Sequence, residues 1–85
     1  MSYTYILKCS DNTFYTGWTK NLDRRLEEHS KGTGSKYTRA RLPVELVYYE
    51  RFLTDSEARK REIEIKKLTR KKKLSLVESF SEGME

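Results

Sequence analysis

The chain has 85 residues, of which 35% are hydrophobic, 12% aromatic and 36% charged. A chain of this length builds one domain around one modest hydrophobic core, which excludes a second independent domain. The 18 Lys and Arg residues exceed the 13 Asp and Glu residues, and the net charge of +5 favours anionic partners such as nucleic acid. One cysteine excludes an intramolecular disulfide, and no apolar run reaches the ~20 residues that span a bilayer. We therefore expect a cytoplasmic protein that is neither secreted nor embedded in a membrane.

The first part of the chain predicts a β-hairpin, a helix and a loop. Residues 3–7 and 13–18 are mainly aromatic, aliphatic or β-branched, and the polar turn between them is typical of a hairpin. Asn21 has the side chain of a good N-cap, and a helix is predicted over residues 22–30 behind it. Residues 31–42 are rich in Gly, Ser, Thr and Arg and are predicted to form a loop.

The second part predicts a third strand and two helices. Val, Leu, Tyr and Phe are interspersed with charges over residues 44–52, which indicates a strand. A capping-box spacing opens a helix over residues 55–68. A further helix is predicted over residues 69–80, with Leu74 and Val77 facing inward.

These elements define the fold class. The order β-β-α-β-α-α predicts an α+β fold, a three-stranded antiparallel sheet flanked by helices, because strands joined by a hairpin cannot belong to an all-parallel sheet. We expect a single domain over residues 1–80 and a frayed tail over residues 81–85.

Positive charge is concentrated in one stretch. Residues 57–73 carry nine basic and three acidic side chains, which give +6, so the remainder of the chain is close to neutral. Such a stretch is either a nucleic-acid footprint or an ordinary solvated helix face. The basic residues that we predict to contact phosphates, here and in the loop before it, are Lys36, Arg39, Arg41, Lys66, Lys67, Arg70, Lys71, Lys72 and Lys73.

Glu62 is the carboxylate with the most informative position. Helical geometry points it between Ala58 and Ile65, inside the apolar stripe of its predicted helix. A carboxylate in that position needs a partner to offset its desolvation. Glu62 therefore either joins a structural salt bridge or binds a cation.

Four other residues have the chemistry that would complete such a site. His29 shares the apolar face of the first predicted helix, Arg25 lies at the edge of that face, and the hairpin places Tyr5 and Tyr15 across from one another. Each has an ordinary alternative, since an inward His or a strand Tyr is commonly a core residue and an Arg is commonly a surface charge. With Glu62, these groups suffice for a single-metal phosphodiesterase, and we expect all five to converge on one concave surface near the hairpin.

Other kinds of site find no support. One Cys and one His exclude a Cys/His zinc site, and no motif supports a nucleophilic pair of Cys9 and His29. The glycine-containing residues 32–36 lack the spacing of a phosphate-binding P-loop.

A series of motifs runs through the chain. It begins with Tyr-Thr-Tyr at residues 3–5 and Tyr-Thr-Gly at residues 15–17, and it continues with Arg25, His29 and a Glu62 that precedes an Ile-Lys pair. With this series the chain resembles the GIY-YIG nuclease superfamily, and it is most similar to the small stand-alone bacterial members. The resemblance covers nearly the whole chain.

Further positions either strengthen the resemblance or depart from it. Residues 36–39, Lys-Tyr-Thr-Arg, are typical of the small members. Tyr3 and Thr4 replace the Gly and Ile of the first motif, and Trp18 stands where some relatives have a Lys.

The resemblance implies a fold and an activity. The fold is a three-stranded antiparallel sheet with flanking helices, and the activity is metal-dependent endonucleolytic hydrolysis of phosphodiester bonds, in DNA repair or processing. Mg²⁺ or Mn²⁺ would bind Glu62, Arg25 would neutralise charge, and Tyr15 or Tyr5 would position the attacking water, aided by His29. The implied partner is nucleic acid, DNA rather than RNA. The alternatives are a non-catalytic nucleic-acid-binding module with a degenerate site, and a partner-docking or regulatory domain.

Overall fold

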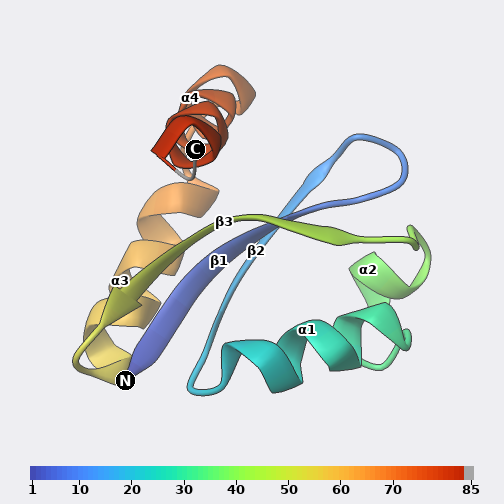
Figure 1. Ribbon diagram of the computed structural model, residues 1–85, viewed down its shortest axis with the longest axis horizontal. Helices are drawn as coiled ribbons and strands as arrows, with labels where there is room; N and C mark the ends of the chain where they lie inside the picture. Colours follow the sequence, from blue (N-terminus) through green and yellow to red (C-terminus); the bar gives the residue numbers. More distant parts are fainter. Residues whose placement is uncertain (84–85) are drawn as a thin grey trace.

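The computed structural model describes residues 1–83, and residues 84–85 lie outside the described residues. Three strands form one antiparallel sheet of order β2-β1-β3, and helices lie on both of its faces (Figure 1). The strands are β1 (Ser2–Lys8), β2 (Phe14–Thr19) and β3 (Glu45–Phe52). The helices are α1 (Leu22–Ser30), α2 (Lys36–Arg39), α3 (Asp55–Lys66) and α4 (Arg70–Gly83). The predicted α+β class, the antiparallel sheet and the order of the long elements are confirmed.

One detail of the predicted elements is wrong. Residues 31–42 are not all loop, because Ser35 accepts a hydrogen bond from the Thr38 backbone N–H at 3.1 Å and so caps the short helix α2. The helix α4 extends as far as Gly83, with the Phe80 ring packed on Tyr48 at 5.5 Å, and the frayed tail over residues 81–85 stays a prediction. The expectation for residues 84–85 falls outside the described residues.

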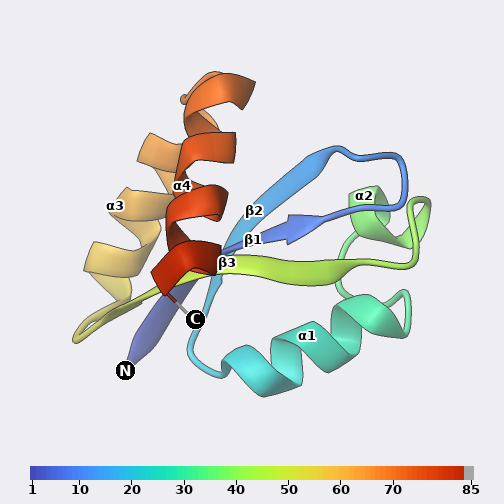
Figure 2. The same ribbon diagram turned by 45° about the horizontal axis from the view of Figure 1, so that its top comes forward.

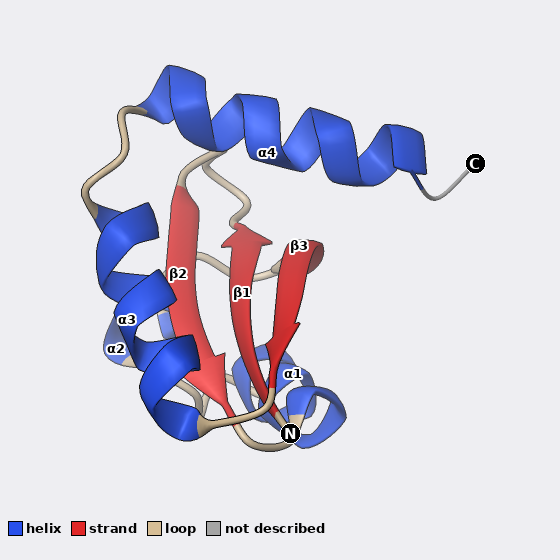
Figure 3. Ribbon diagram, turned by 90° about the vertical axis from the view of Figure 1, so that its left-hand side faces the viewer, coloured by secondary structure: helices blue, strands red, loops and turns tan. Residues whose placement is uncertain are grey.

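The inward face of α4 also differs from the prediction. Leu74 is 37% exposed and does not face the core. Leu76, Val77 and Phe80 pack against the core instead. The helix begins at Arg70 and lies across one end of the strands, so its contact face is set by that crossing (Figure 3).

One face of the sheet is apolar and is covered by α3 and α4. Ile6 packs with Tyr48 and Ile65 in the hydrophobic core. Thr4, on the same face of β1, donates a hydrogen bond from Oγ1 to the Ala58 carbonyl of α3 at 2.6 Å. Side chains alternate along a strand, so the even-numbered residues of β1 face α3.

The other face carries Tyr5 and Leu7, both buried, and lies on the side of α1 and α2 (Figure 2). A register shift between Ile6 and Leu7 lets Ile6 pair with Tyr48 and Leu7 pair with Leu46 on β3. Within residues 1–83 no helix has the length and apolar character needed to cross a bilayer.

Candidate active site

His29 lies at the centre of a polar cluster on the α1 side of the sheet. The residue is fully buried, with an exposed fraction of 0%. The Tyr5 hydroxyl lies 2.8 Å from His29 Nε2, and the Tyr15 ring meets the imidazole edge-on with 5.2 Å between ring centroids. Asn21 caps the helix that carries His29 by accepting a hydrogen bond from the Arg24 backbone N–H at 3.1 Å. The structure therefore brings Tyr5, Tyr15 and His29 into contact.

Tyr5 and Tyr15 are not direct cross-strand partners, so the prediction that they lie across from one another is wrong. Tyr5 pairs with Gly17, and Tyr15 pairs with Leu7. A Cβ atom on Gly17 would lie 2.5 Å from the Tyr5 hydroxyl oxygen. The Tyr5 ring thus leans across Gly17 toward the edge strand β2, and the absence of a side chain on Gly17 makes room for its hydroxyl.

Arg25 lies at the rim of this cluster. Its Nη2 donates a hydrogen bond to the Gly34 carbonyl at 2.8 Å, and its Nη1 forms an ion pair with Glu28 at 3.3 Å. These contacts tie α1 to the loop before α2 and hold the guanidinium beside Tyr5. A guanidinium fixed in this way is suited to bind a phosphate or to neutralise negative charge.

The protonation states of the cluster follow from burial. Burial raises the pKa of Tyr5 to about 12, although the neighbouring Arg25 acts in the opposite direction. Burial also lowers the pKa of His29 to about 4, and the positive charge of Arg25 adds to this lowering. At neutral pH the cluster holds a protonated phenol next to a neutral imidazole. The neutral His29 therefore has a lone pair that can accept a hydrogen bond from a hydroxyl group, while its lowered pKa makes it a weak base.

The helix α2 and the loop before it supply parts of the cluster that were not singled out from the sequence. Thr38 Oγ1 lies 2.9 Å from His29 Nδ1, and Ser35 Oγ lies 2.9 Å from Thr38 Oγ1. A side chain on Gly34 would clash with the His29 ring. The sequence signal for this region was the resemblance of residues 36–39 to small family members. That resemblance does not predict the contact between the Thr38 hydroxyl and His29.

Arg41 was predicted to contact phosphate, but its guanidinium already has partners. It forms an ion pair with Asp11 at 3.0 Å, donates to the Tyr37 carbonyl at 3.0 Å and lies 3.8 Å from the centroid of the Tyr37 ring. Tyr37 in turn stacks on Tyr15 with 5.9 Å between centroids. Arg41 therefore braces the Tyr15 ring, and its phosphate contact stays a prediction.

Glu62 approaches the cluster from the other face of the sheet. Its helix packs on the α3 face, whereas the Tyr5 hydroxyl meets His29 on the α1 face, and the convergence of all five residues on one concave surface stays a prediction. Arg59 lies over the Trp18 ring of β2 at 5.8 Å, and Glu62, one helical turn later, lies on the same side of α3. The negative charge of Glu62 contributes to the raised pKa of Tyr5. Glu62 and Tyr5 are therefore within electrostatic reach of each other at the β2 edge.

The salt-bridge alternative for Glu62 is present in a weak form. Lys66 Nζ lies 3.7 Å from Glu62 Oε1, and the Glu62 side chain is 19% exposed while that of Lys66 is 54% exposed. A long ion pair with an exposed partner contributes little to stability. The Glu62 carboxylate is thus held loosely enough to bind a cation instead.

The single carboxylate of Glu62 is compatible with a magnesium-like ion. Among residues 1–83 no three His, Cys, Asp or Glu side chains gather as a metal-binding group. A closed protein cage is therefore not built here. Mg²⁺ does not need one, because it keeps several waters and takes ligands from substrate phosphates.

Cations lie at both ends of β2. Arg70 lies over the Phe14 ring at 4.8 Å, and Arg59 lies over Trp18 at the far end of the strand. Lys73 is half-buried. The other residues predicted to contact phosphate are exposed, namely Lys36, Arg39, Lys66, Lys67, Arg70, Lys71 and Lys72.

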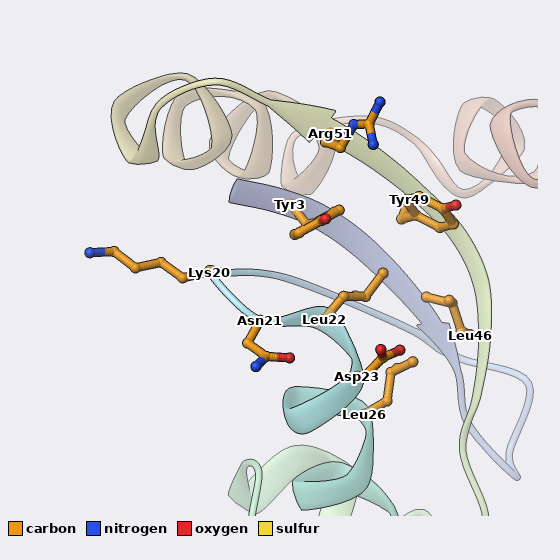
Figure 4. Close-up of a pocket in the computed structure, with 9 residues that line it drawn as sticks. All are labelled: Tyr3, Lys20, Asn21, Leu22, Asp23, Leu26, Leu46, Tyr49 and Arg51. Carbon is orange, nitrogen blue, oxygen red and sulfur yellow. The ribbon is translucent and has the colours of Figure 1, made fainter. Parts of the chain in front are cut away.

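The departures from the family motifs leave the cluster intact. Thr4 and Trp18 face α3, and Tyr3 lines an open groove of about 760 Å³ between α1 and β3 (Figure 4). Neither Tyr5 nor His29 lines that groove. A smaller hollow of about 410 Å³ lies beside Arg25 and reaches Trp18.

Comparison with known proteins gives a family match over most of the chain. The model of the GIY-YIG catalytic domain matches residues 1–75. A UPF0213 protein of Clostridium perfringens is 57% identical over 81 residues, which cover 95% of this chain and 87% of that protein. A UPF0213 protein of Staphylococcus aureus is 55% identical over 75 residues, which cover 88% of this chain and 92% of that protein.

Two solution NMR structures have a similar fold. The UPF0213 protein BH0048 of Bacillus halodurans has 47% sequence identity and a TM-score of 0.59, with 92% of this chain and 84% of that chain covered. The protein EF2693 of E. faecalis has 48% identity and a TM-score of 0.62, with 95% of this chain and 88% of that chain covered.

Proposed function

Because the chain belongs to the GIY-YIG catalytic domain family, we propose that it is a metal-dependent endonuclease that hydrolyses phosphodiester bonds in nucleic acid. The observation that carries this proposal is the contact of the Tyr5 hydroxyl with a buried, neutral His29 beside the Arg25 guanidinium. Such a group can take a proton from water next to a cation that binds phosphate. An ordinary core has little need of a buried phenol and a buried imidazole with a guanidinium at their rim.

In the proposed reaction Tyr5 and His29 activate the attacking water. The Tyr5 oxygen takes a proton from the water while the Tyr5 proton passes to His29 Nε2. The resulting hydroxide forms a bond to phosphorus, the opposite ester P–O bond breaks, and the leaving oxygen keeps the electron pair and takes a proton from solvent. The site is then restored in two transfers. Tyr5 releases to solvent the proton that it took from the water, and His29 returns its proton to Tyr5.

Arg25 and Tyr15 have supporting roles in this scheme. Arg25 donates hydrogen bonds to the non-bridging oxygens, where negative charge builds up in the transition state. Tyr15, held between His29 and Tyr37, orients the water. Glu62 would hold Mg²⁺ or Mn²⁺, which when bound would neutralise charge on the phosphate.

The substrate is proposed to lie along the β2 edge. This edge carries Gly17 over the Tyr5 hydroxyl, with Arg59 and Arg70 at its two ends. Cations on both sides of the scissile phosphate suit a chain of phosphates better than a small phosphate ester. We propose DNA rather than RNA as the substrate, a role in DNA repair or processing, and a cytoplasmic location.

A second candidate function is a binding module with an idle nuclease site. It is favoured by the ion pair between the Lys66 ammonium and Glu62, because Lys66 then occupies the one carboxylate proposed to bind metal. In that case the same basic surface binds nucleic acid without cleaving it.

A plasmid-nicking assay with Mg²⁺ or Mn²⁺ separates the two functions. The wild-type protein is expected to nick the plasmid, while Arg25→Ala is expected to be slower by about 10²- to 10³-fold because it loses charge neutralisation. Arg24→Ala is the matched control, since Arg24 neighbours Arg25 on α1 and is exposed. Binding without nicking by the wild-type protein, on DNA and RNA alike, would favour the binding module.

A further inference from the structure

The second nitrogen of His29 is held as firmly as the first. Nδ1 lies 2.9 Å from Thr38 Oγ1, while Nε2 lies 2.8 Å from the Tyr5 hydroxyl. Both oxygens belong to hydroxyl groups, which can donate or accept. A neutral imidazole has one N–H, so these two contacts alone allow either tautomer.

The hydrogen bonds Tyr5–His29–Thr38 form a series, and the groups at its two ends decide which atom donates in each bond. At one end the Tyr5 hydroxyl lies 2.8 Å from His29 Nε2, and the neighbouring Arg25 can only donate, so the Tyr5 proton is assigned to Nε2. At the other end Thr38 Oγ1 lies 3.4 Å from the Ser35 carbonyl, which can only accept, and 2.9 Å from Ser35 Oγ, which can donate or accept, so the Thr38 proton is assigned to Ser35. Thr38 Oγ1 is then left to accept the proton of His29 Nδ1.

We propose that Thr38 is a positioning residue whose hydroxyl, held by Ser35, fixes His29 as the Nδ1–H tautomer and so keeps Nε2 free to accept the Tyr5 proton. The tautomer assignment rests on the contacts of Tyr5, Thr38 and Ser35, and only its catalytic consequence rests on the proposed nuclease function. When His29 takes the Tyr5 proton, both of its nitrogens carry hydrogen, and Thr38 Oγ1 remains the acceptor for Nδ1. Thr38 therefore supports the imidazole before and after the transfer.

The surroundings prevent the ring from leaving this arrangement. His29 and Thr38 are both fully buried, and the space beside the imidazole is filled by the Gly34 backbone. Ser35 holds Thr38 twice, because its Oγ also accepts from the Thr38 backbone N–H at 3.1 Å. Ser35 thus caps α2 and, through Thr38, also holds the His29 ring in its orientation.

The wild-type tautomer is measured directly by long-range ¹H–¹⁵N NMR of the histidine ring. The chain contains one His, so the two ring nitrogens need no further assignment to a residue. At pH 7 we expect a protonated Nδ1 and an unprotonated Nε2. A spectrum with the proton on Nε2 overturns the proposal, whether or not the protein cleaves nucleic acid.

Two variants of Thr38 test the consequence for catalysis. Thr38→Val keeps the shape but removes the hydroxyl, and we expect loss of the single Nδ1–H tautomer and a cleavage rate lower by about 10²-fold. Thr38→Ser restores the hydroxyl and is expected to restore both. Thr33→Val is the matched control, because the Thr33 hydroxyl donates to the Glu28 carbonyl at 3.1 Å and does not touch His29.

The outcomes separate the positioning role from the nuclease function. Unchanged tautomer and rate in Thr38→Val would overturn the proposal. If the wild-type protein cleaves no substrate, the nuclease function fails, while the ring-nitrogen spectra of the wild type and of Thr38→Ser still decide the role of Thr38. A Thr38→Val protein that does not fold leaves the same two spectra to decide it.

Discussion

The two faces of the sheet are built from different kinds of contact. On the α3 face Ile6, Tyr48 and Ile65 form an apolar core. On the α1 face the buried groups include His29 and Thr38, which are polar and hydrogen-bonded to each other. Apolar burial stabilises the fold, whereas a buried polar cluster must satisfy its hydrogen bonds merely to offset desolvation. The α3 face therefore carries the apolar packing that stabilises the fold, while the α1 face carries the polar cluster for which we propose a catalytic role.

Glu62 lies on α3 and is proposed to act together with Tyr5 of the α1 face. Its substitution is expected to have the largest effect on the cleavage rate. Glu62→Gln should lower the cleavage rate by about 10³-fold, roughly 4 kcal/mol of barrier, because the charge proposed to bind metal is lost. The thermal midpoint should hardly change, since the partner Lys66 is exposed and loses little. Mn²⁺-dependent nicking and thermal melting measure the two quantities.

Glu64→Gln is the control for this change, because Glu64 lies on the same helix and forms an ion pair with Arg61 at 3.2 Å. It should alter neither quantity. If Glu62→Gln is strongly destabilised and the wild-type protein shows no cleavage, Glu62 is a structural residue and the binding-module function is favoured.

The apolar face should respond in stability rather than in chemistry. Ile65→Ala removes a fully buried side chain from the core and should lower the free energy of unfolding by about 3 kcal/mol. Ile63→Ala on the same helix is the control, since Ile63 is 52% exposed and should cost less than about 0.5 kcal/mol. Urea unfolding gives both values. Equal losses in the two variants would contradict the assignment of the core.

The polar face should make stability depend on pH. The pKa of His29 is lowered from 6.5 to about 4 in the fold, so the unfolded chain binds a proton that the folded chain does not between these values. Stability is therefore complete above pH 6.5 and falls as the pH drops toward 4, by about 3 kcal/mol.

Urea unfolding at pH 7.5 and 4.5 measures this loss. The chain contains one His, so His29→Gln should remove most of the pH dependence in this window. The lowered pKa values of Asp11 and Asp55 act below it. A wild-type protein that is equally stable at both pH values would show that His29 is not held neutral by burial.

The basic surface is expected to give the smallest effect. Neutralising Lys71, Lys72 and Lys73 together should weaken DNA binding by about 10-fold and reduce the slope of log K against log salt by up to about 3. Fluorescence anisotropy with a cleavage-deficient Glu62→Gln background measures both. Lys31→Gln is a control, because Lys31 pairs with Glu27 at 3.2 Å on α1. Unchanged affinity and slope would remove this segment from the footprint.

Much of the fold was predictable because it depends on local patterns. Strand propensity, the Asn21 cap and the hydrophobic spacing of the helices are properties of short segments. The end of α4 was not predictable in this way, since it depends on where the Phe80 ring meets Tyr48 and Tyr49. The helix α2 was missed because a single capped turn has too few residues to show a period.

The site was predictable in its residue types and less so in its arrangement. Helical spacing alone predicted that His29 points inward with Arg25 beside it. It also predicted that Glu62 points inward between Ala58 and Ile65. Periodicity does not say which face of the sheet a helix covers, so the position of Glu62 relative to Tyr5 was not predictable from helical spacing. Thr38 was missed because its hydroxyl finds His29 only when the loop has folded.

Gly17 has a consequence for how this sheet can be extended. Both β2 and β3 are edge strands, each with one side of its backbone unpaired within the sheet. A strand added beside β2 would run past Gly17, where the Tyr5 hydroxyl lies, and would close off the approach to Glu62. A strand added beside β3 would leave that approach open. Any assembly of this fold by β-augmentation that preserves access to the site must therefore use β3.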